Sequence, residues 1–363
     1  MVPGTVAEAA KAVRLGHPVR PRGGGTKLEW GGAIEGAEDL DTRGLDRIVE
    51  HNVGDFTAVL EAGVPLAAAQ AAFAEEGQML ALDPPLGDAS AATVGGVVAT
   101  ADSGPLRHRY GSVRDLVVGI TVVLSDGTVA KAGGKVIKNV AGYDLGKLFA
   151  GSFGTLGLIA SVSVRLHPRP QTTATASAAS DDPARLAEVA GRLVALPLEA
   201  DCLDVAWEDG AGRVLVRFGG AAASDQAEHA LTHLAVLDDV TASTDDDAVW
   251  DAQRARQRGD VVVKVSGRLT DLERVLRAAD ARGATVVSRA AHGLSWLSLR
   301  DPSDVPGLRE ALAPRSCTVL DGAARVQDPW PAVAPGTLAL MRRVKARFDP
   351  DGAFKPGAFV GGI

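Results

Sequence analysis

The first candidate for chemistry is a run of three successive glycines in the segment 22–26 (RGGGT). Backbone N–H groups in such a loop can converge on an anion, and the threonine hydroxyl adds a donor. The loop is not a Walker A motif, because G-x-x-x-x-G-K-[ST] occurs nowhere in the chain. It also lacks the dinucleotide fingerprint, because Leu28 stands where that motif needs its last glycine. Both a phosphate-binding loop and an ordinary turn remain open.

Small residues occupy nearly every position from 87 to 104 and form the second candidate, which follows Pro84-Pro85 and precedes Tyr110-Gly111. Such a run cannot fill a core with large side chains, but it lets a flat ligand lie against the backbone. A buried helix packed through small residues is the alternative. The residues Val94–Ala99 alone are typical of a strand.

The third candidate is the segment 138–144 (KNVAGYD), followed by Gly151, Gly154 and Gly157. These glycines could line a turn before a strand predicted at 156–166. Tyr143 lies within the segment and is one of only 2 tyrosines in the chain. A core position with a satisfied hydroxyl is the commoner place for such a residue.

The composition restricts the function classes. Of the 42 glycines, 26 fall in residues 1–170 and 16 in residues 171–363, so the excess belongs to the first part. The net charge of −7 and the absence of a basic run argue against nucleic-acid binding. No apolar stretch reaches the ~18 residues of a membrane span, and the start lacks signal-peptide features. The 2 cysteines provide neither a disulfide framework nor a zinc motif, so we expect no metal site and a cytoplasmic protein.

The predicted elements indicate an α+β chain in two parts. Up to residue 168 we expect helices at 5–15, 64–76 and 144–150, and strands at 18–21, 56–60, 116–124 and 156–166. From 172 the order strand-helix-strand-strand-helix occurs twice, which predicts two ferredoxin-like halves that share an antiparallel sheet. The first series has strands at 172–178, 201–208 and 213–218 with helices at 183–195 and 224–236. The second has strands at 261–266, 284–290, 294–299 and 316–320 with helices at 270–282 and 303–313. The acidic patch 245–247 between them reads as a solvated loop, and a last helix is expected near 337–347.

In this order, the three segments resemble the FAD-binding domain of the para-cresol methylhydroxylase (PCMH) or vanillyl-alcohol oxidase type over about residues 4–168. The resemblance implies that the first loop cradles the pyrophosphate of FAD. It also implies that the second segment contacts pyrophosphate, ribityl chain and isoalloxazine, and that Gly157 and Ile159 approach the cofactor through backbone. The implied cofactor-binding residues are Pro21, Arg22, Gly23, Gly24, Gly25, Thr26, Leu28, Pro84, Pro85, Thr93, Val94, Gly95, Gly96, Ala99, Thr100, Ser103, Gly104, Tyr110, Gly111, Gly142, Tyr143, Gly157 and Ile159.

Within this family the chain is similar to the small FAD-binding subunits of bacterial glycolate oxidase, through the segments 136–145, 147–149 and 151–157 and the C-terminal 348–357. Lys355 stands where asparagine is more usual. Some relatives attach FAD covalently through a histidine beside the first loop or through a cysteine. Here Thr26 follows the glycines and neither cysteine lies in a cofactor motif, so we expect non-covalent FAD. The implied organisation is a two-part PCMH-type FAD-binding domain (1–168), an α/β cap (169–335) and a C-terminal segment (336–363) that returns to the FAD-binding domain.

The resemblance implies an FAD-dependent 2-hydroxy-acid dehydrogenase or oxidase subunit, whose flavin accepts a hydride from the substrate α-carbon and passes electrons to a partner. The implied partners are a larger flavoprotein subunit and an iron–sulfur subunit. None of the 7 histidines lies in the His-x-His cluster of the larger family members, and His292 is the only candidate for a substrate-side base. His229 and His233 lack the glutamate of a zinc motif and indicate a solvated helix face. A non-catalytic structural or electron-relay subunit is therefore the alternative, and a sugar-nucleotide reductase with the same flavin domain is a third reading.

Overall fold

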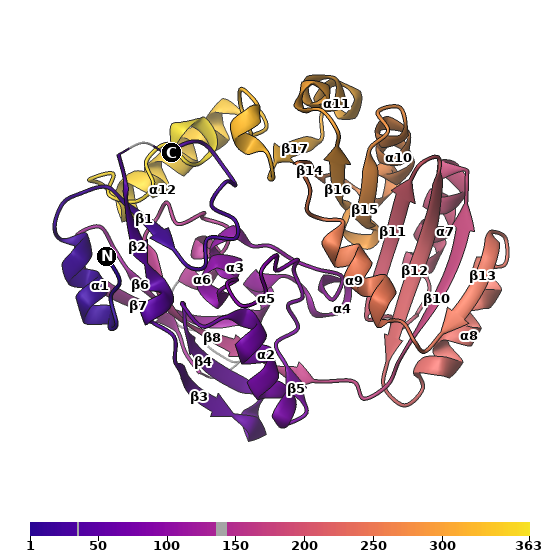
Figure 1. Cartoon of the computed structure of the whole chain (residues 1–363), viewed down its shortest axis with the longest axis horizontal. Coiled ribbons are helices and arrows are strands. Elements are labelled where there is room, and N and C mark those ends of the chain that lie inside the picture. Colours follow the sequence, from indigo (N-terminus) through magenta and orange to yellow (C-terminus); the bar gives the residue numbers. More distant parts are fainter. Residues whose placement is uncertain (35, 136–143) are drawn as a thin grey trace. The chain divides into compact units, whose positions relative to one another are not determined.

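The computed structural model describes residues 1–34, 36–135 and 144–363. The chain divides into two compact units (Figure 1). The first comprises residues 1–103, 111–169 and 332–363, and the second comprises 104–110 and 170–331. In the described ranges, no helix is long and apolar enough to cross a membrane.

The first unit is built on a five-stranded antiparallel sheet in the order β3-β4-β8-β6-β7. Its strands are β3 (Ile48–Asn52), β4 (Thr57–Glu61), β6 (Val117–Val123), β7 (Val129–Gly133) and β8 (Leu158–Arg165). Two small sheets accompany it: β1 (Val19–Arg22) pairs in parallel with β2 (Glu38–Asp41), and β5 (Gln78–Met79) pairs with β9 (His167–Pro168). The glycine loop begins at the end of β1, so the parallel pair fixes its position.

The helices of the first unit are α1 (Val6–Val13), α2 (Leu66–Glu75), α3 (Val94–Thr100), α5 (Val113–Leu116), α6 (Leu145–Phe149) and α12 (Pro335–Phe348). The prediction of a strand at Val94–Ala99 is wrong, because this run forms α3. The Thr93 side chain accepts a hydrogen bond from the Gly96 N–H at 3.2 Å and caps the helix, which satisfies a donor that a strand would have to pair elsewhere. The alternative of a buried helix packed through small residues describes α3.

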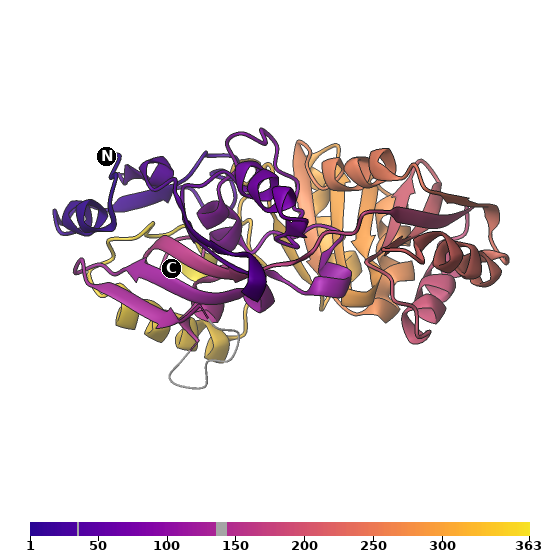
Figure 2. The ribbon, with the colours of Figure 1, turned by 90° about the horizontal axis from the view of Figure 1, so that it is seen from below.

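The C-terminal segment joins the N-terminal strand. The Val19 N–H donates to the Ala353 carbonyl at 2.7 Å, and the Lys355 N–H donates to the Val19 carbonyl at 3.0 Å. Lys345 of α12 donates through Nζ to the carbonyls of Thr155 (2.7 Å) and Phe354 (2.8 Å). Figures 1 and 2 both show the yellow C-terminal segment running along the first unit. Residues more than 300 positions apart are thereby brought to one edge of this unit.

The second unit contains one eight-stranded antiparallel sheet in the order β13-β10-β12-β11-β15-β16-β14-β17. The first half has β10 (Thr173–Ser180), α7 (Pro183–Ala195), β11 (Cys202–Glu208), β12 (Ala211–Gly219), α8 (Ala223–Leu234) and β13 (Asp238–Ser243). The second has β14 (Val261–Ser266), α10 (Leu272–Asp280), β15 (Thr285–Arg289), β16 (Leu294–Leu299), α11 (Val305–Leu312) and β17 (Ser316–Val319). Each half has the ferredoxin-like strand order, and the halves join where β11 pairs with β15. The predicted fold class is confirmed.

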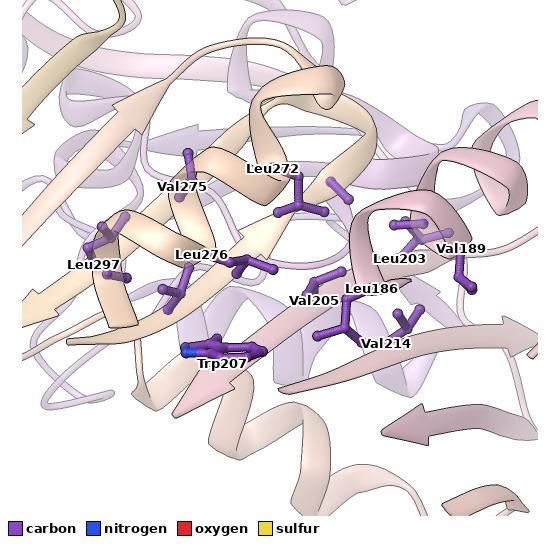
Figure 3. Packing of buried hydrophobic residues seen from close by; sticks show 14 of the residues in the cluster. Leu186, Val189, Leu203, Val205, Trp207, Val214, Leu272, Val275, Leu276 and Leu297 are labelled. Atoms are coloured by element: carbon purple, nitrogen blue, oxygen red, sulfur yellow. The ribbon is translucent and has the colours of Figure 1, made fainter. Parts of the chain in front are cut away.

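Apolar side chains from both halves form one core. Figure 3 shows side chains of α7 and β11, such as Leu186 and Val205, in the same cluster as Leu276 of α10 and Leu297 of β16. The apolar i, i+3, i+4 spacing of α10 places Leu272, Val275 and Leu276 on its buried face. The two halves therefore share one hydrophobic core and form a single domain rather than two linked repeats.

The acidic patch corrects another expectation. Two elements lie here that the sequence did not indicate, β13 and the helix α9 (Asp247–Ala255). Asp246 is not solvated: its side chain is buried and accepts hydrogen bonds from the hydroxyls of Thr173 (2.9 Å) and Thr175 (2.7 Å). It also pairs with Arg217 at 2.9 Å. A buried carboxylate is tolerated here because each oxygen has a donor.

Candidate functional site

A pocket in the first unit collects residues from the glycine loop, from α3 and from the start of β8. Of the residues implied by the resemblance, those that line it are Pro21, Arg22, Gly23, Gly24, Gly25, Thr26, Leu28, Thr93, Gly95, Gly96, Ala99, Thr100, Gly157 and Ile159. The lining residues that sequence reasoning missed are Lys27, Thr42, Ala62, Ala92, Val97, Phe153, Gly154, Leu158 and Lys355. Segments that are separate in the sequence thus form one cavity.

The glycine loop lies flat against the chain that enters α3. A Cβ at Gly24 would stand 1.7 Å from the Ala91 carbonyl oxygen, and one at Gly23 would stand 2.1 Å from the Thr93 hydroxyl. Gly25 has φ +81°, a left-handed conformation that glycine adopts without steric cost. At 24 only glycine fits without a backbone shift, whereas a side chain at 23 would displace the Thr93 side chain that caps α3.

The two glycines of α3 have different roles. A Cβ at Gly95 would meet the Cβ of Ala62 at 2.6 Å and its carbonyl oxygen at 2.9 Å, so Gly95 allows α3 to pack on the sheet. A Cβ at Gly96 would meet only the Thr93 hydroxyl, at 3.2 Å, and otherwise faces open space. Gly96, rather than Gly95, therefore leaves room on the pocket side of α3.

Two cationic side chains of the pocket are paired. Arg22 Nη1 lies 3.0 Å from Asp39 Oδ2, and Arg20 Nε donates to the other carboxylate oxygen at 2.6 Å. These bonds, with that of Arg20 the strongest, hold the pKa of Asp39 below its usual value. Lys27 Nζ lies 2.6 Å from Asp102 Oδ2, and both side chains are buried.

The third cation of the pocket is Lys355, which is only 6% exposed. Burial, with a smaller contribution from the charge of Arg20, lowers its pKa to about 8. The pocket therefore combines backbone donors, threonine hydroxyls and positive charges. Such a set suits the pyrophosphate and polar groups of a dinucleotide.

The other residues implied by the resemblance lie outside this lining. Within the first unit these are Pro84, Pro85, Val94, Ser103 and Gly111. Gly104 and Tyr110 belong to the second unit, and Gly142 and Tyr143 lie outside the described residues. Gly111, at φ +83°, turns the chain into α5 beside Asp115, so a turn accounts for it.

His292 lies in the second unit beside a second histidine. It ends the short helix η4 (Ala290–His292), and its ring centroid is 6.2 Å from that of His108 in α4 (Arg107–Tyr110). Burial, aided by the charges of His292 and Arg109, lowers the pKa of His108 to about 4. His108 is therefore a neutral imidazole at pH 7.

Tyr110 is next to this pair along α4. Burial, with the nearby carboxylate of Asp201, raises its pKa to about 12. Burial also raises the pKa of Asp201, against the opposing charges of Arg109 and Arg217. Tyr110 is therefore a protonated hydrogen-bond donor at neutral pH.

Sequence comparisons with known proteins indicate the same class of ligand as the residues that line the pocket. Residues 1–133 match the sequence profile of the family described as "FAD binding domain". The chain is 38% identical over 157 residues to "Glycolate oxidase subunit GlcE" of Escherichia coli, which covers 43% of this chain and 44% of that protein. It is 35% identical over 192 residues to "Glycolate oxidase subunit GlcD" of Bacillus subtilis, covering 52% and 40%. The match to "Probable D-lactate dehydrogenase, mitochondrial" of Danio rerio is 34% over 182 residues, covering 48% and 36%.

The sequence matches therefore span less than half the length of each of these relatives. The fold extends further: a solved alkyldihydroxyacetonephosphate synthase superposes over 98% of this chain and 76% of its own, with a TM-score of 0.71 at 14% identity. The glycine-rich cavity and the family match coincide in the first unit. Residues 1–133 therefore match an FAD-binding domain of the PCMH type, and the cofactor of this domain is FAD.

Proposed function

We propose that the chain is the FAD-binding subunit of a 2-hydroxy-acid oxidoreductase of the glycolate type. The carrying observation is the pocket itself: 14 residues implied by the resemblance, from segments between 21 and 159, line a single cavity. The named relatives that act on glycolate or D-lactate support the substrate class. Two of these relatives are named as subunits, which supports a multi-subunit complex. The proposed partners, a larger flavoprotein subunit and an iron–sulfur subunit, follow from the family resemblance alone.

Each part of the pocket has a task in holding FAD. Backbone N–H groups of the glycine loop, with the Thr26 hydroxyl, would hold the pyrophosphate, and the backbone around Gly157 and Ile159 would lie along the ring system. Arg22 and Lys27 are fixed by Asp39 and Asp102, so their positive charges are already in place before FAD binds. Bound FAD supplies the redox chemistry as a hydride acceptor, and the protein binds and orients it.

A non-catalytic electron-relay subunit is the second candidate, and one observation favours it. Among the described residues that line the pocket there is no histidine, aspartate or glutamate. The only proposed substrate-side base, His292, belongs to the second unit. A general base must reach the proton that it removes, so a lining without a histidine or a carboxylate favours a role in electron relay.

Anaerobic mixing separates the two candidates. The purified chain is first examined by its absorbance spectrum and by acid precipitation, which releases non-covalent FAD into the supernatant. Glycolate or D-lactate is then added without oxygen. Bleaching of the flavin by the chain alone supports the proposed oxidoreductase. An oxidised flavin that is reduced only after partner subunits are added establishes the relay role instead.

A further inference from the structure

Lys355 enters the pocket from the C-terminal segment. Its backbone is fixed by the bond from its N–H to the Val19 carbonyl (3.0 Å) and by the bond from the Ala358 N–H to its own carbonyl (3.1 Å). Its side chain lies against the glycine-rich segment, since a Cβ at Gly154 would be 3.5 Å from the Lys355 Cδ and 3.6 Å from the Pro21 Cγ. The Lys355 side chain therefore lies near the start of the glycine loop and the turn before β8, and the residue lines the pocket.

The amine of Lys355 has no counter-charge among the described residues. Two other lysines of this unit with little exposed side chain each have a carboxylate partner: Lys27 pairs with Asp102 at 2.6 Å and Lys345 with Asp349 at 2.5 Å. The Nζ of Lys355 makes no hydrogen bond or ion pair within the described chain, although the residue is only 6% exposed. The charge of Arg20 has the same sign and, after burial, lowers the pKa of Lys355 further. A buried cation without a partner costs free energy unless a ligand brings the opposite charge.

The backbone at Lys355 is a second, independent sign. Lys355 has φ +40°, in the left-handed region that glycine and asparagine occupy more readily than lysine. A lysine at position 355 therefore costs free energy twice, once through backbone strain and once through desolvation of its charge. Residues held in this way concentrate at functional sites.

We infer that the ammonium of Lys355 is the counter-charge for the negative charge of bound FAD. This rests on the FAD site described above and assigns a binding role to a residue outside the glycine-rich segments. FAD carries negative charge on its pyrophosphate in every oxidation state, and the isoalloxazine gains negative charge when the flavin is reduced to its anion. A contact with the pyrophosphate raises FAD affinity equally in both states, whereas a contact with the ring system raises the reduction potential.

The test compares variants of the full-length chain. Lys355→Asn removes the charge and suits the left-handed backbone, Lys355→Arg keeps the charge, and Lys11→Met removes a charge from an exposed position of α1 as a matched control. The dissociation constant of FAD is measured by flavin fluorescence between pH 6.5 and 9.5. The two-electron midpoint potential is measured on each FAD-loaded protein.

For a pyrophosphate contact we expect Lys355→Asn to weaken FAD binding about tenfold or more at pH 7, the size of a charge-assisted bond. That difference from wild type shrinks above about pH 8, where the free amine deprotonates. For a contact with the ring system we expect the affinity for oxidised FAD to change little. Reduced FAD then binds about tenfold less tightly, which lowers the midpoint potential by about 30 mV.

Either result supports the inference, provided that Lys355→Arg and Lys11→Met behave like wild type or retain most of its affinity. The inference is overturned if Lys355→Asn matches wild type in both affinity and potential. Wild-type protein that binds no FAD would instead reject the site itself, and it does so without any variant. Circular dichroism of each variant verifies that the fold is intact.

Discussion

At the scale of single residues, this protein places buried charge where a ligand must complete it. Lys27 and Lys345 have internal partners, and Lys355 does not. The free-energy cost of burying the unpaired Lys355 charge is present in the FAD-free protein and is removed when FAD binds. Stability and affinity are therefore expected to respond in opposite directions to a change at Lys355.

We predict that Lys355→Met stabilises the FAD-free protein. The pKa of about 8 in the folded protein lies below the ordinary lysine value of 10.5, so the unfolded chain binds the proton more readily. The resulting cost in stability is fully present below pH 8. At about 1.4 kcal/mol per pKa unit, the difference between 10.5 and about 8 corresponds to about 3 kcal/mol, which removal of the amine should add to the free energy of unfolding at pH 7. Urea unfolding of the FAD-free proteins measures this. The gain should fade between pH 8 and 10.5, and a loss of stability at pH 7 would contradict the prediction.

We predict that His108 makes the second unit sensitive to acid. Its pKa falls from 6.5 to about 4 on folding, chiefly through burial, so the unfolded chain takes up the proton first as the pH falls. Stability should drop by up to about 3 kcal/mol between pH 6.5 and pH 4 for this group alone. His108→Phe should flatten that part of the pH profile, while the exposed His17→Phe should leave it unchanged. Equal slopes in wild type and His108→Phe would remove His108 as the cause.

At the scale of elements, α3 positions the pocket, and its two adjacent glycines can be separated by substitution. Gly95→Ala should destabilise the protein by about 1–3 kcal/mol, because its Cβ would meet Ala62 at 2.6 Å. Gly96→Ala should be neutral or stabilising by up to about 1 kcal/mol, since alanine is the better helix former and the Cβ meets only a hydroxyl. Thermal unfolding of the two FAD-free variants measures the difference. Equal destabilisation by both would mean that α3 is packed on both faces.

Elements with a strong periodic pattern could be predicted from the sequence. The helix 183–195 and the strands 261–266 and 294–299 have the expected bounds, because alternation or i, i+3, i+4 spacing extends over their whole length. In α3, β-branched valines suggested a strand, but a threonine cap and close packing at Gly95 decide the helix. The elements β13 and α9 were missed because polar residues dominate them, and Asp246 becomes buried only through tertiary partners.

The residues of the candidate site likewise divide into those that the sequence could predict and those that it could not. The glycine loop could be found because the proposed contact with phosphate requires consecutive residues without side chains. Lys355 could not be placed there, since its contact with the pocket depends on a pairing between Val19 and Phe354, which are 335 positions apart. The only available signal was a lysine where the family more usually has asparagine. A local pattern therefore identified the cofactor, and a long-range contact supplied the charge.

At the scale of the whole molecule, the pocket is lined by β1 and by the C-terminal segment, which pair at Val19 and Phe354. FAD should therefore stabilise these two segments together. By mass action, FAD at about 100 times its dissociation constant adds about 2.7 kcal/mol to the stability of the folded state that binds it. Amides whose exchange requires this state to open should be slowed by a corresponding factor.

We predict that hydrogen exchange slows on FAD addition in four separate segments, 22–28, 93–100, 154–159 and 353–358, which line the pocket or flank it. Peptides from α8, which contributes no lining residue, serve as the internal reference. The segment 353–358 decides the test because no glycine-rich motif links it to FAD. Protection of the first three segments without this one would show that FAD binds without the C-terminal segment. In wild type, all four segments should be protected together. If Lys355→Asn then loses protection only in 353–358, the amine couples this segment to the cofactor.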